Sequence, residues 1–244
     1  MLLQSLLISA LAAASAAAES QIHGKREVCT PKSFGDLSKD DTPAIMEAIA
    51  SCGNGGTTVI PQGTTYSLRT MLDFKNCKNC DFQIEGTIKS SSDTDYWSGP
   101  PAIIYLKNVQ GAKIRSLQGT GTIDASGQAA WDRFATDTNF KRPTILFIQG
   151  GADISVSNLK FRDPPNAFFG QKGGATRINF SHLDMSAISK SNNQPRHTDG
   201  FDVGESRFTS ITDCTIVNQD DCIAFKSGCN YVDVQRVTCA GTVS

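Results

Sequence analysis

One apolar pattern recurs along the carboxyl-terminal half of the chain, at positions here called a, a+2, a+5 and a+7. Its full copies are Ile154, Val156, Leu159, Phe161; Ile178, Phe180, Leu183, Met185; Thr209, Ile211, Cys214, Ile216; and Val232, Val234, Val237, Cys239. Their starting points lie 24, 31 and 23 residues apart. A weaker copy starts at Ala112 and continues with Ile114, Leu117 and Gly119. Each copy predicts two short strands separated by a corner, with one face always pointing inward.

Units this small cannot bury an apolar face alone, so they must stack on one another. The two-residue Asn-Gly or Asp-Gly turns of β-hairpins are absent at these junctions, which favours parallel coils over a hairpin sheet. We therefore expect an all-β fold, a right-handed parallel β-helix (solenoid). A β-sandwich is the alternative, because strand spacing alone does not exclude it.

A short helix is expected to cap the first coil. The stretch "DDTPAIMEAIASC" offers Thr42 as N-cap and Pro43 at the first helical position. Its apolar residues Ile45, Ala48, Ile49 and Cys52 share one helical face. Such a helix would cover the unpaired strand edges of the first coil.

The amino-terminal residues have the composition of a targeting segment. Residues 1–18 are uncharged, leucine-rich and end in alternating small residues, which predicts a signal peptide. A membrane anchor is the alternative, but the apolar core is shorter than the ~20 residues that a spanning helix needs. Residues 19–28, with the dibasic pair Lys25 and Arg26, are interpreted as a linker or propeptide, and residues 29–244 as one domain. We expect a secreted, extracellular protein without a membrane partner.

Charge and cysteine content narrow the possible partners. The net charge of −1 gives no basic excess for nucleic acid. All eight cysteines follow the predicted signal, which favours disulfides. The "CKNC" at 77–80 is interpreted as a disulfide or a pair of small core residues rather than a metal site, and no metal or cofactor is expected. Asn179, in Asn-Phe-Ser, is a predicted glycosylation site.

Acidic residues gather at one point of the repeat. Asp220 and Asp221 follow the inward Ile216, on a turn past a strand, and the longer preceding coil contains Asp199 and Asp202. Residues one coil apart come to neighbouring positions about 5 Å from each other. The pattern therefore predicts three carboxylates on one flank, those of Asp199, Asp220 and Asp221.

These motifs resemble a known family. "HTDGFD" followed by "NQDDCIAFKSG" is similar to the N-T-D and (G/Q)-D-D motifs of the family 28 glycoside hydrolases, the polygalacturonases and their pectin-cleaving relatives. "VIPQGTTYSL" and "GTGTIDASGQAAWD" also look like that family's opening segments. The resemblance covers nearly the whole chain after the signal.

The resemblance implies an inverting hydrolase of α-1,4-galacturonosyl linkages in pectic polysaccharide. Asp220 would be the general acid, and Asp199 and Asp221 would hold and activate the attacking water. Crowding of three acids should raise the pKa of at least one, so that one carboxyl keeps a proton. The motifs do not separate endo from exo attack or plain from xylose-substituted polymer; we lean toward an exo-acting or xylogalacturonan-type enzyme. Trp131, Arg133, Phe134 and Phe140 lie in a long insertion expected to shape one end of the groove.

Two departures from the family's pattern are visible. His197 stands where the family usually has asparagine. After Cys239 the chain reads "AGTVS", without the family's Gly-His-Gly and Arg-Ile-Lys motifs. The remaining basic candidates for a galacturonate carboxylate are Lys226, Arg196 and Lys190. We accordingly expect a truncated sequence, inactive and prone to aggregate alone, of a protein that is a monomer at full length.

The resemblance also implies two disulfides, Cys222 with Cys239 and Cys29 with Cys52. The partners of Cys77, Cys80, Cys214 and Cys229 stay open. Two other functions are kept: a calcium-dependent pectate-lyase-like β-helix, which the Asp-Asp motif argues against, and a non-catalytic wall-binding module.

Overall fold

A computed structural model describes residues 26–241 of the chain. The predicted signal peptide, residues 1–18, and most of the predicted linker or propeptide, residues 19–28, lie outside the described residues. Within the described part, none of the helices combines the length and apolar character needed to cross a membrane.

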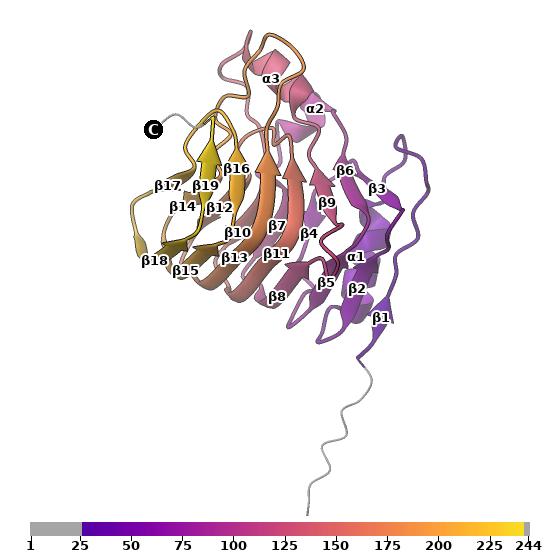
Figure 1. Ribbon diagram of the computed structural model, residues 1–244. Coiled ribbons are helices and arrows are strands. Elements are labelled where there is room, and N and C mark those ends of the chain that lie inside the picture. The colour runs from indigo at the N-terminus through magenta and orange to yellow at the C-terminus, as the bar shows by residue number, and fades with distance from the viewer. Residues whose placement is uncertain (1–25, 242–244) are drawn as a thin grey trace, which may run out of the picture.

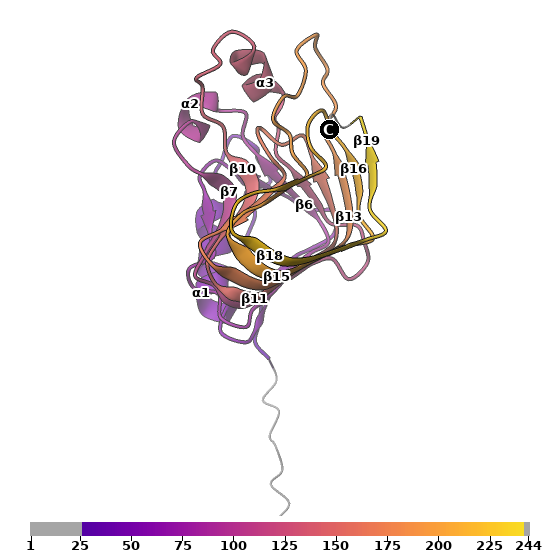
Figure 2. The same cartoon turned by 90° about the vertical axis from the view of Figure 1, so that its left-hand side faces the viewer.

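The chain winds through successive coils, and their strands form three walls around a common interior (Figures 1 and 2). The strands belong to a 13-stranded and a 6-stranded sheet. Neighbouring strands are parallel along the whole stack, from β1 with β2 at one end to β15 with β18 at the other. This confirms the predicted parallel β-helix over the sandwich, whose sheets would pair antiparallel strands.

The walls follow one another in every coil. The first wall contains β1 (Val28–Cys29), β2 (Thr57–Ile60), β5 (Asp81–Ile84), β8 (Gln110–Arg115), the first halves of β11 (Ala152–Arg162) and β13 (Ala175–Ser186), β15 (Ser206–Thr212) and β18 (Cys229–Gln235). The second wall contains β3 (Thr65–Leu68), β6 (Thr87–Ser90), β9 (Thr122–Asp124), the second halves of β11 and β13, β16 (Thr215–Val217) and β19 (Thr238–Ala240). The third wall contains β4 (Leu72–Asp73), β7 (Ala102–Lys107), β10 (Thr144–Gln149), β12 (Phe169–Lys172), β14 (Phe201–Val203) and β17 (Ile223–Phe225).

The strand register reproduces the apolar repeat. Position a of each coil lies opposite position a of the next, from Ile154 through Ile178 and Thr209 to Val232. Position a+7 is aligned in the same way, from Phe161 to Cys239. The inward face predicted from the sequence is therefore the face that the coils bury against one another.

A left-handed residue makes the corner within each full copy. Position a+4 has φ between 51° and 56° in all four copies, at Asn158, His182, Asp213 and Arg236. Residues with a side chain seldom adopt this conformation, and its recurrence at one position marks a corner that the stack imposes. The corner falls where the repeat predicted a break between two strands.

The weaker copy at Ala112 is correct only in its first half. Ala112 and Ile114 pair with Ile154 and Val156. Leu117, by contrast, is 56% exposed, and Ile123 takes the position opposite Phe161. The reason is a loop between these strands that is folded around the buried Glu85 carboxylate, which accepts hydrogen bonds from Ser116, Leu117 and Thr120.

Aromatic rings fill the interior at the level of the acidic coils. Phe169 packs against Phe161, Phe180 and Phe201, with ring centroids 4.7, 4.9 and 5.1 Å apart. All four side chains are buried. Each coil is thus held to the next through a shared core as well as through the strand ladders.

Helix α1 (Thr42–Cys52) covers the amino-terminal end of the stack, against β1 to β4 (Figure 1). Its predicted buried face, including Ile45, Ala48 and Ile49, is confirmed. The predicted N-cap was wrong by one residue, because the helix includes Thr42 and Asp41 precedes it. The Asp41 carboxylate accepts hydrogen bonds from the backbone N–H of Phe34 and Ser67 (both 2.8 Å) instead of capping the helix.

Two further helices lie in the connections that lead into the third wall, and the apolar repeat did not predict them. They are α2 (Thr94–Trp97), before β7, and α3 (Gln128–Phe134), before β10. They contact each other beyond the edge of the walls (Figure 1), and Arg133 of α3 is ion-paired with Asp95 of α2 at 2.5 Å. The insertion containing Trp131 therefore stands beside the third wall.

Three disulfides are present in the described residues. Cys29 is bonded to Cys52 and Cys222 to Cys239, as the resemblance implied. Cys77 is bonded to Cys80, one of the two possibilities left open for this pair. Cys214 and Cys229 form no disulfide within residues 26–241.

Candidate active site

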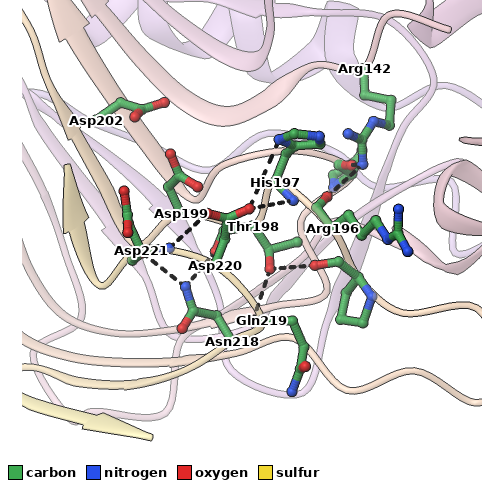
Figure 3. Close-up of polar contacts among 12 residues, drawn as sticks. Arg142, Arg196, His197, Thr198, Asp199, Asp202, Asn218, Gln219, Asp220 and Asp221 are labelled. Atoms are coloured by element: carbon green, nitrogen blue, oxygen red, sulfur yellow. Dashed lines mark hydrogen bonds and ion pairs between the residues drawn. The ribbon is translucent and has the colours of Figure 1, made fainter. Parts of the chain in front are cut away.

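Two neighbouring strands of the third wall bring the aspartates together. Asp199 and Asp202 flank the start of β14, while Asp220 and Asp221 occupy the turn before β17. The pairing of these strands continues into the turn, where the backbone N–H of Gly200 donates to the carbonyl of Asp221 (2.9 Å). Figure 3 shows Asp199, Asp220 and Asp221 gathered on one flank, as the coil repeat predicted.

The Asp220 carboxylate is held by the backbone on both sides. Its Oδ2 accepts a hydrogen bond from the His197 N–H and its Oδ1 from the Asp221 N–H, both at 2.9 Å (Figure 3). The side chain is 28% exposed. Asp220 is therefore fixed in direction but open to a molecule approaching from solvent.

A buried pair of polar residues joins the two acidic loops. The Asn218 Nδ2 donates to the carbonyls of Thr198 (2.7 Å) and Asp221 (3.0 Å). The Thr198 hydroxyl in turn donates to the Pro195 carbonyl (2.6 Å). Thr198 and Asn218 are both completely buried. Asn218 was not among the predicted site residues, although it stands only two residues before Asp220.

Lys226 is paired with the aspartates of the preceding coil. Its Nζ lies 2.6 Å from Asp202 Oδ1 and 3.7 Å from Asp199 Oδ2. The hydrogen bond to Asp202 raises the pKa of Lys226, and the charge of Asp199 adds to the effect. This ammonium was a predicted substrate contact, and in the structure it already contacts two carboxyl groups.

Asp199 is the carboxyl whose pKa is raised by burial and by its acidic neighbours. Burial, followed by its hydrogen bond to Asp202 and the charges of Asp202 and Asp220, raises the pKa of Asp199 to about 8, although Lys226 opposes the shift. The raised pKa falls on Asp199, whereas the resemblance assigns the acid role to Asp220. The cause is position, since the Asp199 side chain is 14% exposed and that of Asp220 is twice as exposed, at 28%.

The other predicted basic residues are placed differently. His197 is beside Asp220, with its Nδ1 at 3.9 Å from Oδ2 and its ring 61% exposed. The Arg196 side chain points away from the aspartates (Figure 3). Lys190 belongs to a loop attached to α3, where its N–H donates to Gln128 (2.6 Å). Of the three, only His197 reaches the carboxylate cluster.

Arg142 is a site residue that no sequence signal indicated. Its Nη1 donates to the carbonyls of Pro165 (2.9 Å) and Arg196 (2.8 Å), and its guanidinium lies 3.8 Å from the centroid of the Phe134 ring. Burial lowers the pKa of Arg142 to about 10, although the charge of Asp220 opposes the shift. Because Arg196 is followed by His197, this anchor also fixes the N–H that holds Asp220.

A strip of side chains crosses the outer face of the third wall in line with Asp202. The strand register aligns Tyr105, Phe147, Gly170 and Asp202 on successive strands, which are spaced about 4.7–4.9 Å apart. The Phe147 ring lies over Gly170, where a Cβ atom would come within 2.6 Å of it. Tyr105 stacks on Phe147, with centroids 6.3 Å apart, and the Lys172 ammonium lies 5.3 Å from the Phe147 centroid. Flat rings with a nearby cation suit an extended chain of acidic sugars.

Comparison with known proteins identifies a family and close relatives of this chain. Residues 52–242 match the model of the glycosyl hydrolases family 28. Endo-xylogalacturonan hydrolase A of Aspergillus tubingensis is 54% identical over 226 residues, which are 93% of this chain and 55% of that protein. Probable endo-xylogalacturonan hydrolase A of Emericella nidulans is 51% identical over 94% of this chain and 57% of its own length. The chain thus spans a little over half the length of these curated relatives.

Solved structures agree on the fold. The crystal structure of endo-xylogalacturonan hydrolase from Aspergillus tubingensis matches with a TM-score of 0.88 and 55% identity, over 88% of this chain and 58% of that one. The exopolygalacturonase from Thermotoga maritima matches with a TM-score of 0.72 over 89% of this chain and 61% of that one. At 15% identity, this second likeness concerns the right-handed parallel β-helix alone.

Proposed function

The chain belongs to the glycosyl hydrolases family 28, and from that premise we propose that it hydrolyses α-1,4-galacturonosyl linkages in a xylose-substituted pectic polysaccharide. The observation that carries the proposal is the meeting of Asp199, Asp220 and Asp221 from two consecutive coils, at the positions of the family's motifs (Figure 3). Carboxyl groups of differing protonation are what glycoside hydrolysis requires.

Asp220 is the proposed general acid. Glycosidic cleavage needs a proton on the leaving oxygen. The Asp220 side chain is more exposed than that of Asp199, so a substrate can reach it more easily. The raised pKa of Asp199 means that the crowded cluster keeps a proton at neutral pH. In the proposed step Asp220 gives its carboxyl proton to the leaving oxygen.

Asp199 and Asp221 are the proposed base and water-positioning residues. Their backbones are held side by side, since Gly200 donates to Asp221 and Asn218 donates to the carbonyls of Thr198 and Asp221. Attack by a water that they orient, on the face opposite Asp220, inverts the anomeric carbon. The Lys226 ammonium, 3.7 Å from Asp199 and 2.6 Å from Asp202, supplies the nearby positive charge that opposes the crowding of these carboxyls.

The polymer is proposed to lie along the strip formed by Tyr105, Phe147 and Gly170. Rings that stack on sugar faces and Lys172, which can meet a uronate carboxylate, support this path. The path runs in the stacking direction of the coils, so a long chain can extend on either side of the aspartates.

Substrate type and location rest on different observations. The names of the relatives support a xylose-substituted polymer as the substrate. They support endo attack and not the exo attack expected from the sequence. Three disulfides among the described residues support an extracellular location. The pectic polysaccharide is the proposed partner.

The test is product analysis by NMR during digestion of xylogalacturonan and of polygalacturonate. We expect the β-anomer to appear first, because inversion at an α-linkage gives β, and faster release from xylogalacturonan. Initial release of the α-anomer would contradict the inverting mechanism. An unsaturated product lost on calcium chelation would identify a lyase, and binding without product would identify a non-catalytic module.

A further inference from the structure

A side pocket lies next to the carboxylate cluster and is not used by the mechanism above. It has a volume of about 180 Å³, and its lining residues are Trp131, Phe134, Ala135, Thr138, Asn192, Asn193, Gln194 and Arg196. The insertion around α3 supplies one side and the loop before β14 the other. Pockets for drug-sized ligands start at about 300 Å³, so this one has room for a single sugar ring.

Contacts around Phe134 fix the position of the side pocket relative to the aspartates. The Phe134 ring meets the edge of the His197 ring at 5.4 Å, and the Arg142 guanidinium lies on it at 3.8 Å. His197 in turn holds Asp220. The pocket therefore lies on the Phe134 side of His197, next to the residues that precede β14, and none of the residues of the strip Tyr105, Phe147 and Gly170 lines it.

Hydrogen bonds hold the two sides of the side pocket together. Asp132 Oδ1 accepts hydrogen bonds from Gln128 (3.1 Å), Ser191 (2.6 Å) and Asn193 (2.8 Å), which attach the loop to α3. Trp131, which is buried, donates its indole N–H to the Pro164 carbonyl (2.9 Å). A pocket that exists before binding loses less entropy when a ligand enters.

The lining has unused hydrogen-bonding capacity. In the described residues, the side chains of Thr138, Asn192 and Gln194 make no hydrogen bond to protein. Two amides and a hydroxyl offer both donors and acceptors, which suits sugar hydroxyls, and the exposed part of Phe134 offers a flat apolar surface. Arg196 is the single charged residue of the lining, and the other lining side chains are neutral groups that suit the hydroxyls of a sugar ring.

We propose that the side pocket binds the xylosyl branch of the galacturonate unit held at the aspartates. This inference rests on the proposed function and deepens it, because it assigns the preference for a branched polymer to defined residues. A pentose branch projects to one side of the main chain, and the pocket lies beside the aspartates and not on the strip proposed for that chain.

The test measures the affinity ratio between galacturonate oligosaccharides with and without one xylosyl branch, by calorimetry in an Asp220→Asn background. Ala135→Phe fills the pocket from the end of α3, and Asn192→Ala with Gln194→Ala removes its free amides. We expect either change to lower the ratio roughly tenfold or more, as expected when a pocket loses contact with one group. Thr136→Phe, also exposed at the end of α3 but outside the pocket, is the matched control and should leave the ratio unchanged.

Three outcomes would overturn the inference. A parent protein that binds both oligosaccharides equally has no branch pocket, and equal weakening of both by Ala135→Phe would place the main chain there. No effect of either pocket variant would exclude the site. Failure of the parent to bind either oligosaccharide would instead reject the proposed function itself, so the two failures are distinguishable.

Discussion

At the scale of single residues, the crowding of Asp199, Asp202 and Asp220 destabilises the fold. Asp199 and Asp202 are close enough to share a hydrogen bond, and the charge of Asp220 also reaches Asp199. Lys226 compensates only in part, because it opposes but does not cancel the rise in the pKa of Asp199. Such groups are retained at functional sites because their protonation is useful there.

Asp199→Asn should therefore stabilise the protein in a pH-dependent way. The folded pKa of Asp199, about 8, lies above its ordinary value of 3.8. Below pH 4 the carboxyl is protonated in both states, and between pH 4 and 8 the folded state keeps a proton that the unfolded state releases, so stability falls as pH rises. Removing the carboxyl should add about 1–3 kcal/mol at pH 8 and almost nothing at pH 4.

Denaturant unfolding of both proteins at the two pH values measures this difference. Asp233→Asn, an exposed substitution on the last coil described, serves as the control and should change stability little at either pH. A gain from Asp199→Asn that is equal at pH 4 and pH 8 would show that Asp199 is not the carboxyl that keeps the proton.

Asp220→Asn tests the proposed acid. The amide has the same size and its oxygen can still accept one of the two backbone hydrogen bonds, but it cannot deliver a proton. We expect kcat on xylogalacturonan to fall by about 10² to 10⁴-fold, the usual contribution of a general acid, with substrate affinity and melting temperature nearly unchanged. More than a tenth of the original rate in the variant would rule out this role.

At the scale of elements, the turn between β16 and β17 depends on a covalent link. It contains Asp220 and Asp221, and Cys222 at its end is bonded to Cys239 of β19 in the next coil. Asn218 holds the same turn to the preceding coil. The turn with Asp220 and Asp221 is thus attached on both sides, to the coil before it by hydrogen bonds and to the coil after it by a disulfide.

Replacing Cys222 and Cys239 together by serine should lower the free energy of unfolding by about 2–4 kcal/mol. The loop that this disulfide closes spans 17 residues, against 3 for Cys77 and Cys80. Because closure of a longer loop restricts the unfolded chain more, the Cys77→Ser and Cys80→Ser pair should cost clearly less. Chemical denaturation of both double variants compares them, and equal losses would contradict the loop-length argument.

At the scale of the whole molecule, the sequence predicted the features that recur in every coil and missed the segments that occur in one coil only. The a, a+2, a+5, a+7 pattern located the inward face, the corners and the meeting of Asp199 with Asp220 and Asp221, because stacking turns sequence spacing into spatial proximity. The repeat gave no signal for α2, α3, Arg142 or the side pocket. They belong to segments inserted between the repeated strands, and these segments are held by single contacts such as that of Gln128 with Ser189. The raised pKa of Asp199 depends on its burial and on its contact with Asp202; the motif contains Asp202 but shows neither the burial nor the contact.

Stacking also implies that stability depends on the position of a coil, because each coil contacts only its neighbours. Phe169, buried between Phe161, Phe180 and Phe201, joins two coils, whereas Phe225, on β17 at the end of the third wall as described, is 58% exposed. Phe169→Ala should therefore cost about 3–5 kcal/mol, and Phe225→Ala less than about 1 kcal/mol. Hydrogen exchange followed by mass spectrometry resolves the effect along the stack: Phe169→Ala should speed exchange in β10, β12 and β14, with β2 and β5 the least affected. Uniform acceleration across all strands would mean that the stack unfolds as one cooperative unit and that the nearest-neighbour description is wrong.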